Sequence, residues 1–176
     1  MSLKIIGKLN ANNIRCTVLT KGVFPSELGN SNGYSNRNEY GITLVSLNEK
    51  FRINFEPNSA KFEDRIASLK YLHKKGFKTW ISMEPYPTPN LIKQDLMEIL
   101  EAVSFVDKIF FGKLNYSVKS SAFKYSKEFY NSLASAVVNF CKKTELLVMS
   151  SKEHKYKEVT FPSFLAQRAN RRTTVP

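Results

Sequence analysis

Residues 60–83 read AKFEDRIASLKYLHKKGFKTWISM and contain a complete helix–turn–strand unit. In the first part, apolar residues recur at helical spacing and share one face: Phe62, Ile66, Leu69 and Leu72. We expect a helix over 60–75, with Asn58 or Ser59 as its N-cap and Gly76 at its end. The run Thr79–Met83 that follows is rich in β-formers and predicts a buried strand.

The same alternation of apolar runs and amphipathic segments extends over the rest of the chain. Four more strands are predicted: Arg15–Thr20, Ile42–Leu47, Lys108–Phe111 and Leu146–Met149. Three more helices are predicted: 3–10, 90–104 (capped by Thr88, with Pro89 in its first turn) and 121–142.

These short, continuous apolar strands are typical of a parallel sheet that is covered by helices. We therefore expect an α/β fold with a parallel sheet of about five strands and alternating helices. Five strands are too few for a closed barrel of eight strands and about 250 residues. An open sheet and the later part of a barrel both fit. The fold is expected to occupy residues 1–151, followed by a basic, partly disordered C-terminal extension over 152–176.

The charge of the chain favours anionic partners. Its 176 residues include 27 Lys+Arg and 15 Asp+Glu, which gives a net charge of +12. Nucleic acid, a nucleotide or a phosphate-bearing substrate would suit this charge. No apolar run reaches the ~18 residues of a membrane span. The N-terminal MSLKIIGKLN lacks a signal-peptide core, so a cytoplasmic location is expected.

The residues that bind metals are sparse and widely separated. The two cysteines, Cys16 and Cys141, form no CxxC or CxxxCxxC motif, and His73 and His154 are equally isolated. The sequence therefore predicts no metal site. It also lacks GxGxxG, Walker A and GxSxG motifs.

Polar residues follow the predicted strands at their carboxyl ends, where parallel α/β folds build their sites. Lys21 could hold a carboxylate or a phosphate, and Ser46 could donate a hydrogen bond. Glu84 could accept from an ammonium group or a ribose hydroxyl. This edge of the sheet suits a small charged ligand.

Several blocks, in order, resemble the radical S-adenosylmethionine (SAM) superfamily, and within it the spore photoproduct lyase-related group. They are LTK (19–21), the strand ending in Ser46, FEP (55–57) followed by Arg65, TWISMEPYPTPN (79–90) and FFGKLNY (110–116). The resemblance spans residues 5–150 and implies part of a TIM-like barrel. It also implies a 4Fe–4S cluster that cleaves SAM to a 5′-deoxyadenosyl radical.

The resemblance also implies roles for individual residues. Lys21 and Ser46 would contact the carboxylate and amino group of SAM, and Arg65 would brace the site or its loop. Glu84 and Asn115 would line the pocket. The family's CxxxCxxC is absent, so this chain ligates no cluster. The chain is therefore expected to be the C-terminal part of a longer enzyme and to be inactive alone, and repair of DNA lesions is a candidate role for that enzyme.

Other functions remain open. A natural relative without a cluster would keep the scaffold alone. A non-catalytic basic module would bind nucleic acid or a nucleotide, and an unrelated small α/β enzyme would use the strand-end residues directly. An incomplete barrel would also leave a strand edge exposed beside Arg15–Thr20, which predicts self-association.

Overall fold

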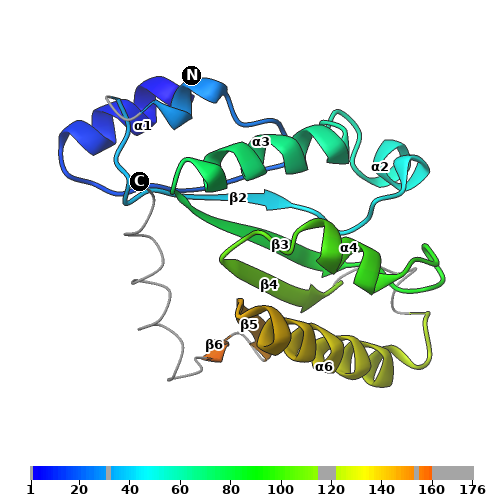
Figure 1. Ribbon diagram of the computed structural model, residues 1–176. Coiled ribbons are helices and arrows are strands. Elements are labelled where there is room, and N and C mark those ends of the chain that lie inside the picture. Colours follow the sequence, from blue (N-terminus) through cyan, green and yellow to red (C-terminus); the bar gives the residue numbers. More distant parts are fainter. Residues whose placement is uncertain (1, 31–32, 115–121, 153–154, 160–176) are drawn as a thin grey trace.

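A computed structural model describes residues 2–30, 33–114, 122–152 and 155–159. Along the chain, its elements are α1 (Ser2–Ala11), β1 (Thr17–Thr20), the 3-10 helix η1 (Ser26–Gly29), β2 (Glu39–Thr43), α2 (Glu49–Phe55), α3 (Phe62–Lys74), β3 (Lys78–Tyr86), α4 (Leu96–Ala102), β4 (Lys108–Lys113), α6 (Ser126–Thr144), β5 (Leu147–Lys152) and β6 (Lys155–Val159). They confirm the predicted α/β class (Figure 1).

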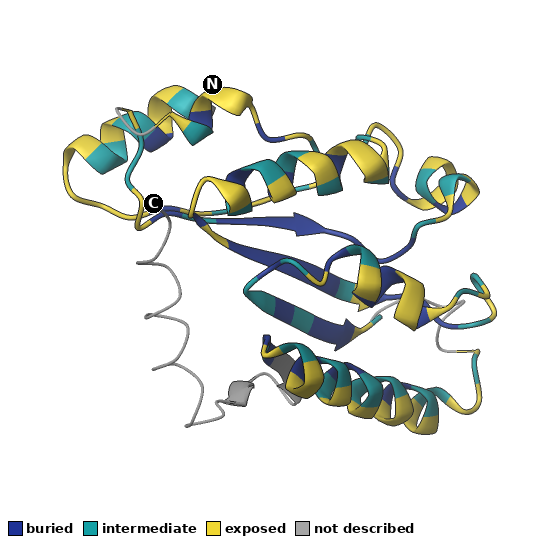
Figure 2. Ribbon diagram, in the orientation of Figure 1, coloured by how far each residue is buried: buried dark blue, intermediate teal, exposed yellow. Residues whose placement is uncertain are grey.

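All the strands belong to one sheet, in the order β1-β2-β3-β4-β5-β6. Strands β1 to β5 are parallel, as expected, and β6 is antiparallel to β5. The helices α3, α4 and α6 cover one face of this curved sheet (Figure 1). Their apolar side chains and those of the strands form a single buried cluster. Its dense centre lies along β2 and β3, which are dark blue in Figure 2.

The α3–β3 unit confirms the helix and strand predicted from residues 60–83. Leu69 and Leu72 of α3 are completely buried against the sheet. Gly76 follows the helix with a φ of +87°, a left-handed conformation that favours glycine. The predicted capping by Asn58 or Ser59 was wrong. Lys61 holds the N-cap position without a side-chain bond, and the Ser59 hydroxyl accepts from Arg65 instead.

The helix predicted over 90–104 is shorter than expected. The helix α4 spans Leu96–Ala102, and its N-cap is Asp95, whose carboxylate accepts from the Met97 amide at 2.8 Å. The predicted cap, Thr88, instead begins a turn and accepts from the amides of Leu91 and Ile92. Asp95, directly before the first residue of α4, caps the helix, so the helix does not begin at Thr88 and Pro89 as predicted.

The second strand is shifted from its predicted position at Ile42–Leu47. Strand β2 spans Glu39–Thr43, and the ladder is lost after the Leu44 amide donates to the Ser82 carbonyl. Beyond that point the backbone is satisfied by side chains. The Val45 carbonyl accepts from Gln94, and the Ser46 hydroxyl accepts from the Asn48 amide. The apolar run 44–47 is therefore a buried loop, which resembles a strand in sequence.

Four further differences concern the predicted elements. The third, fourth and fifth strands extend two or three residues past their predicted ends. The helix predicted over 121–142 spans Ser126–Thr144, and residues 115–121 lie outside the described part. The 3-10 helix η1 and the helix α2 were not predicted. Strand β6 lies in the segment where only an irregular extension was expected. In the described part of the chain, no helix is long and apolar enough to cross a bilayer.

Candidate functional site

The parallel strands bring the predicted site residues to one edge of the sheet. Lys21 immediately follows β1, and Ser46 lies three residues past β2. Glu84 lies near the carboxyl end of β3. Because β1, β2 and β3 are adjacent and parallel, these positions lie at neighbouring strand ends. Asn115 lies outside the described residues.

Lys21 and Arg65 are joined through Glu56. The Lys21 Nζ lies 3.0 Å from Glu56 Oε1, and the Arg65 Nη2 lies 2.9 Å from Glu56 Oε2. The side chains of Glu56 and Arg65 are 8% and 2% exposed, whereas that of Lys21 is 46% exposed. One buried carboxylate therefore connects a buried cation to a cation at the surface.

Arg65 braces the loop between α2 and α3. Its guanidinium donates to the Ala60 carbonyl at 2.8 Å, to the Ser59 hydroxyl at 2.9 Å and to the Thr43 carbonyl at 3.0 Å. Thr43 is the last residue of β2, so Arg65 ties this loop to a strand end. The amide of Ala60 also donates to the Lys21 carbonyl at 2.9 Å. Arg65 thus acts on the site through its neighbours.

Ser46 lies in the buried loop beyond β2. Ser46 is 8% exposed, and its hydroxyl oxygen accepts from the Asn48 amide at 3.1 Å. Asn48 in turn caps α2 by accepting from the Phe51 amide at 3.0 Å. The Ser46 oxygen is fixed as an acceptor by this turn, and its proton remains suited to donation.

Glu84 lies across the neighbouring strand β4. A Cβ placed on Gly112 would lie 2.6 Å from both the Cγ and the Cδ of Glu84. The β3–β4 register shifts between Met83 and Tyr86, and the Glu84–Pro85 peptide bond is cis. The Glu84 side chain thus lies over a glycine near the end of β4.

The sheet face opposite the helices is polar and aromatic. Ile81 and Met83 point into the helix-covered core, so Trp80, Ser82 and Glu84 point to the other face. Trp80 packs edge-on against Phe110, with ring centroids 4.9 Å apart. Its indole Nε1 is buried and has no hydrogen-bond partner among the described residues.

The described residues do not fit an iron–sulfur cluster. No group of three His, Cys, Asp or Glu side chains among them could hold a metal ion. Cys16 and Cys141 are both buried. Burial also raises the pKa of Cys141 to about 12, so its thiol keeps its proton at neutral pH and is a poor metal ligand. The strand-end residues, in contrast, offer a cation, a hydroxyl and a carboxylate, which suit a small charged ligand.

Sequence reasoning missed part of this site. Glu56 was noted only as part of the FEP block, and its pairing with Lys21 and Arg65 was not predicted. Gln94, which donates to the Val45 carbonyl at 2.8 Å, was not singled out. The available signal for Glu56 was its place in the FEP block, ahead of Arg65.

The comparisons with known proteins identify the class of fold. No family model and no curated protein matches this sequence. Among solved structures, the chain has the fold of a radical SAM enzyme. This confirms, at the level of the fold, the predicted likeness to the radical SAM superfamily. The placing in the spore photoproduct lyase-related group stays a prediction.

Three of the similar structures are those of SuiB from Streptococcus suis. The structure of SuiB without a named ligand matches with a TM-score of 0.60 and 20% identity. SuiB bound to SAM matches with a TM-score of 0.58 and 19% identity, and SuiB bound to the precursor peptide SuiA with 0.58 and 20%. Each match covers 86% of this chain and 35–36% of SuiB, so the chain spans about a third of the SuiB length.

Proposed function

We propose that this chain is the SAM-holding part of a radical SAM iron–sulfur enzyme, and that the cluster ligands come from polypeptide outside this sequence. The match to about a third of SuiB supports this division. The lack of a cluster-binding group in the described residues supports it as well. The chain alone would therefore bind SAM without cleaving it, because the cluster supplies the reducing electron.

Each site residue has a defined task in this proposal. The Lys21 ammonium binds the carboxylate of SAM, and the Ser46 hydroxyl donates to its methionine portion. Glu84 accepts from the SAM ammonium or a ribose hydroxyl, and the role that the resemblance implies for Asn115 stays a prediction. Arg65 holds the loop that carries Glu56. The observation that carries the proposal is the position of Lys21, Ser46 and Glu84 at adjacent strand ends of a radical SAM fold.

Isothermal titration with SAM tests the proposal. We expect the chain to bind SAM, and Lys21→Met and Ser46→Ala each to weaken binding several-fold. Lys78→Met is the matched control, because Lys78 is an exposed lysine at the start of β3, at the other end of the strands. Absence of SAM binding would contradict the proposal, as would equal losses in Lys21→Met and Lys78→Met.

The substrate of the whole enzyme is a separate part of the proposal. The sequence blocks favour the spore photoproduct lyase-related group, and therefore a DNA lesion as the substrate. The SuiB structure with SuiA makes a peptide the competing class. Release of 5′-deoxyadenosine by the parent enzyme, with ultraviolet-damaged DNA or with peptides as substrate, distinguishes them. Stimulation by peptides alone would exclude the DNA assignment.

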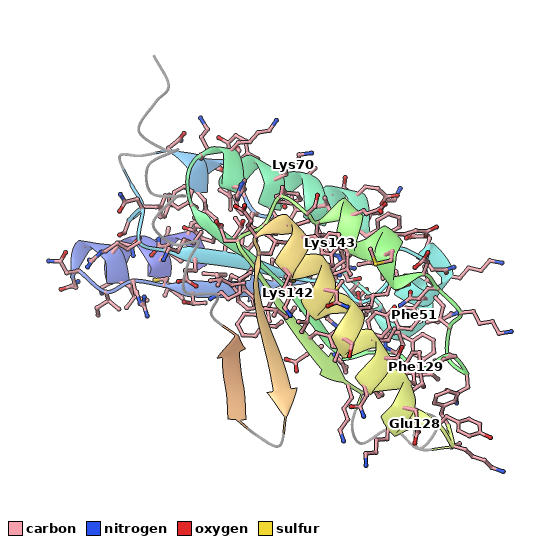
Figure 3. The ribbon with its side chains drawn as sticks, turned by 60° about the horizontal axis from the view of Figure 1, so that its bottom comes forward. Phe51, Lys70, Glu128, Phe129, Lys142 and Lys143 are labelled. Carbon is pink, nitrogen blue, oxygen red and sulfur yellow. The ribbon has the colours of Figure 1, made fainter. Side chains whose placement is uncertain are left out.

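A second candidate function is binding of nucleic acid by the chain as a basic module. Exposed lysines gather where strands begin, opposite the SAM site: Lys74, Lys75, Lys78, Lys142 and Lys143. Figure 3 shows Lys142 and Lys143 at one end of α6 and Glu128 at the other. Binding of single- or double-stranded DNA with a steep loss of affinity as salt rises would support this function. No binding at low salt would exclude it.

A further inference from the structure

We infer that Glu56 is a positioning residue that holds the Lys21 ammonium at the edge of the site, ready for a carboxylate on the ligand. The inference rests on the proposed function, because that carboxylate belongs to SAM. It assigns Glu56 no contact with the ligand itself.

The geometry gives Lys21 a fixed partner on one side and solvent on the other. Its Nζ lies 3.0 Å from Glu56 Oε1, while the side chain remains 46% exposed. A lysine ammonium has three donors, so one bond to Glu56 leaves donors for a ligand. A free lysine at the surface would sample many rotamers and would lose that freedom on binding.

Glu56 can hold Lys21 because Glu56 is itself held. Its second oxygen pairs with Arg65 Nη2 at 2.9 Å. Arg65 is buried and is fixed by oxygen atoms of Thr43, Ser59 and Ala60. The chain of contacts therefore runs from the end of β2 through Arg65 and Glu56 to Lys21, and it fixes the ammonium relative to the sheet.

The charges of this chain of contacts leave one positive charge unmatched. Lys21 and Arg65 are cations, and Glu56 is the carboxylate between them. The neighbouring Glu49 and Arg52 pair with each other at 2.6 Å and balance their own charges. The unmatched charge lies at the exposed end, on Lys21. The site therefore suits a ligand group with a single negative charge, such as a carboxylate.

Glu56→Asp is the variant that separates reach from charge. Aspartate keeps the negative charge and is shorter by one methylene. It should stay with Arg65, because a buried guanidinium loses more than an exposed lysine when its partner is removed. Lys21 is then released to solvent, while the net charge of the site is unchanged. Any loss of affinity therefore reports the position of Lys21.

Two ligands and a double-mutant cycle complete the binding test in the full chain. 5′-Methylthioadenosine lacks the amino-acid portion of SAM and hence the carboxylate. We expect Glu56→Asp to weaken SAM binding roughly two- to fivefold and to leave 5′-methylthioadenosine binding unchanged. In a Lys21→Met background, Glu56→Asp should have no further effect on SAM binding. Equal losses for both ligands, or a loss that persists without Lys21, would overturn the inference.

A measurement without ligand distinguishes this inference from the proposed function. Reductive ¹³C-methylation keeps the lysine charge and makes each lysine visible by NMR. We expect a Lys21 signal separate from those of the solvent-exposed lysines, and we expect it to join them in Glu56→Asp. A Lys21 signal already among the exposed lysines in the native chain would overturn the inference, whether or not SAM binds. Failure of SAM to bind would overturn the proposed function alone.

Discussion

The side chain of Glu84 on β3 lies directly over the backbone of Gly112 on β4. Any Cβ at residue 112 would meet the Cγ and Cδ of Glu84 at 2.6 Å, well inside contact distance. An alanine at residue 112 would therefore require the Glu84 side chain to move, although the backbone φ there is not in the left-handed region. The pair places a carboxylate at the strand ends, beside the proposed SAM site.

Gly112→Ala should displace the Glu84 side chain from the strand ends. Because the clashing atoms belong to a flexible side chain that can turn away, the loss in the free energy of unfolding should stay below about 1 kcal/mol, which urea denaturation measures. SAM affinity should fall in parallel. The control is Gly7→Ala in α1, where a Cβ meets nothing within 4 Å and alanine should stabilise the helix by about 0.5–1 kcal/mol. Unchanged SAM affinity in Gly112→Ala would contradict the placing of the Glu84 carboxylate in the proposed SAM site.

Arg65→Met should destabilise the fold strongly. The Glu56 carboxylate, which is only 8% exposed, would lose its buried cationic partner. The Thr43 and Ala60 carbonyls would also lose the guanidinium that donates to them. Breaking a buried ion pair in this way costs about 3–5 kcal/mol. Arg52→Met is the control, because Arg52 belongs to a neighbouring pair with an exposed glutamate, and its loss should be clearly smaller. Similar urea midpoints for the two variants would contradict the bracing role of Arg65.

The protein should lose stability at alkaline pH. Burial raises the pKa of Cys141 from its ordinary 9.0 to about 12, and that of Tyr86 from 10.0 to about 12. The folded state therefore holds protons that the unfolded state releases. The stabilisation is complete below about pH 9 and is lost as the pH rises towards 12, by at most about 1.4 kcal/mol per pH unit for each group.

Cys141→Ala isolates the thiol contribution. In the unfolded state the thiol of Cys141, with its lower ordinary pKa of 9.0 against 10.0 for Tyr86, contributes most of the change between about pH 9 and 10. The urea midpoint of the native chain should fall over this interval, and the fall should be smaller in Cys141→Ala, whatever the variant's stability at neutral pH. Parallel curves for both proteins would contradict the assignment.

The free edge of β1 should mediate self-association. Within the described part of the chain, β1 pairs with β2 and lies at the end of the sheet, and its Leu19 is 47% exposed. Unpaired strand edges attract further strands, and a lysine on such an edge opposes this. Sedimentation velocity should show concentration-dependent association that Leu19→Lys abolishes. A monomer at every concentration would exclude the edge as an interface.

The parallel sheet and the strand ends at which the candidate site residues lie could be predicted from the sequence, because both follow from local patterns. The α3–β3 unit shows why, since helical spacing, a glycine and a β-rich run are all encoded within 60–83. Lys21, Ser46 and Glu84 could be placed at one edge by topology alone.

Contacts between distant residues could not be predicted in the same way. The Glu56–Arg65 and Lys21–Glu56 pairs join residues from separate loops, and no periodic pattern encodes them. The end of β2 was misplaced for a related reason. Leu44 and Val45 are apolar and buried, but the Val45 carbonyl accepts from the Gln94 side chain, and the Asn48 amide donates to the Ser46 hydroxyl. Apolar character shows burial, and hydrogen bonding decides whether a segment is a strand.

The most direct test of the proposed SAM site is amide NMR of the ¹⁵N-labelled chain titrated with SAM. The account predicts that the largest shifts gather at Lys21, Gly22, Ser46 and Glu84, at the carboxyl ends of β1 to β3. The amide signals of residues at the opposite ends of the strands, such as Lys78 and Lys143, should not shift. The absence of shifts, or shifts confined to those lysines, would contradict the central claim that this edge of the sheet holds SAM.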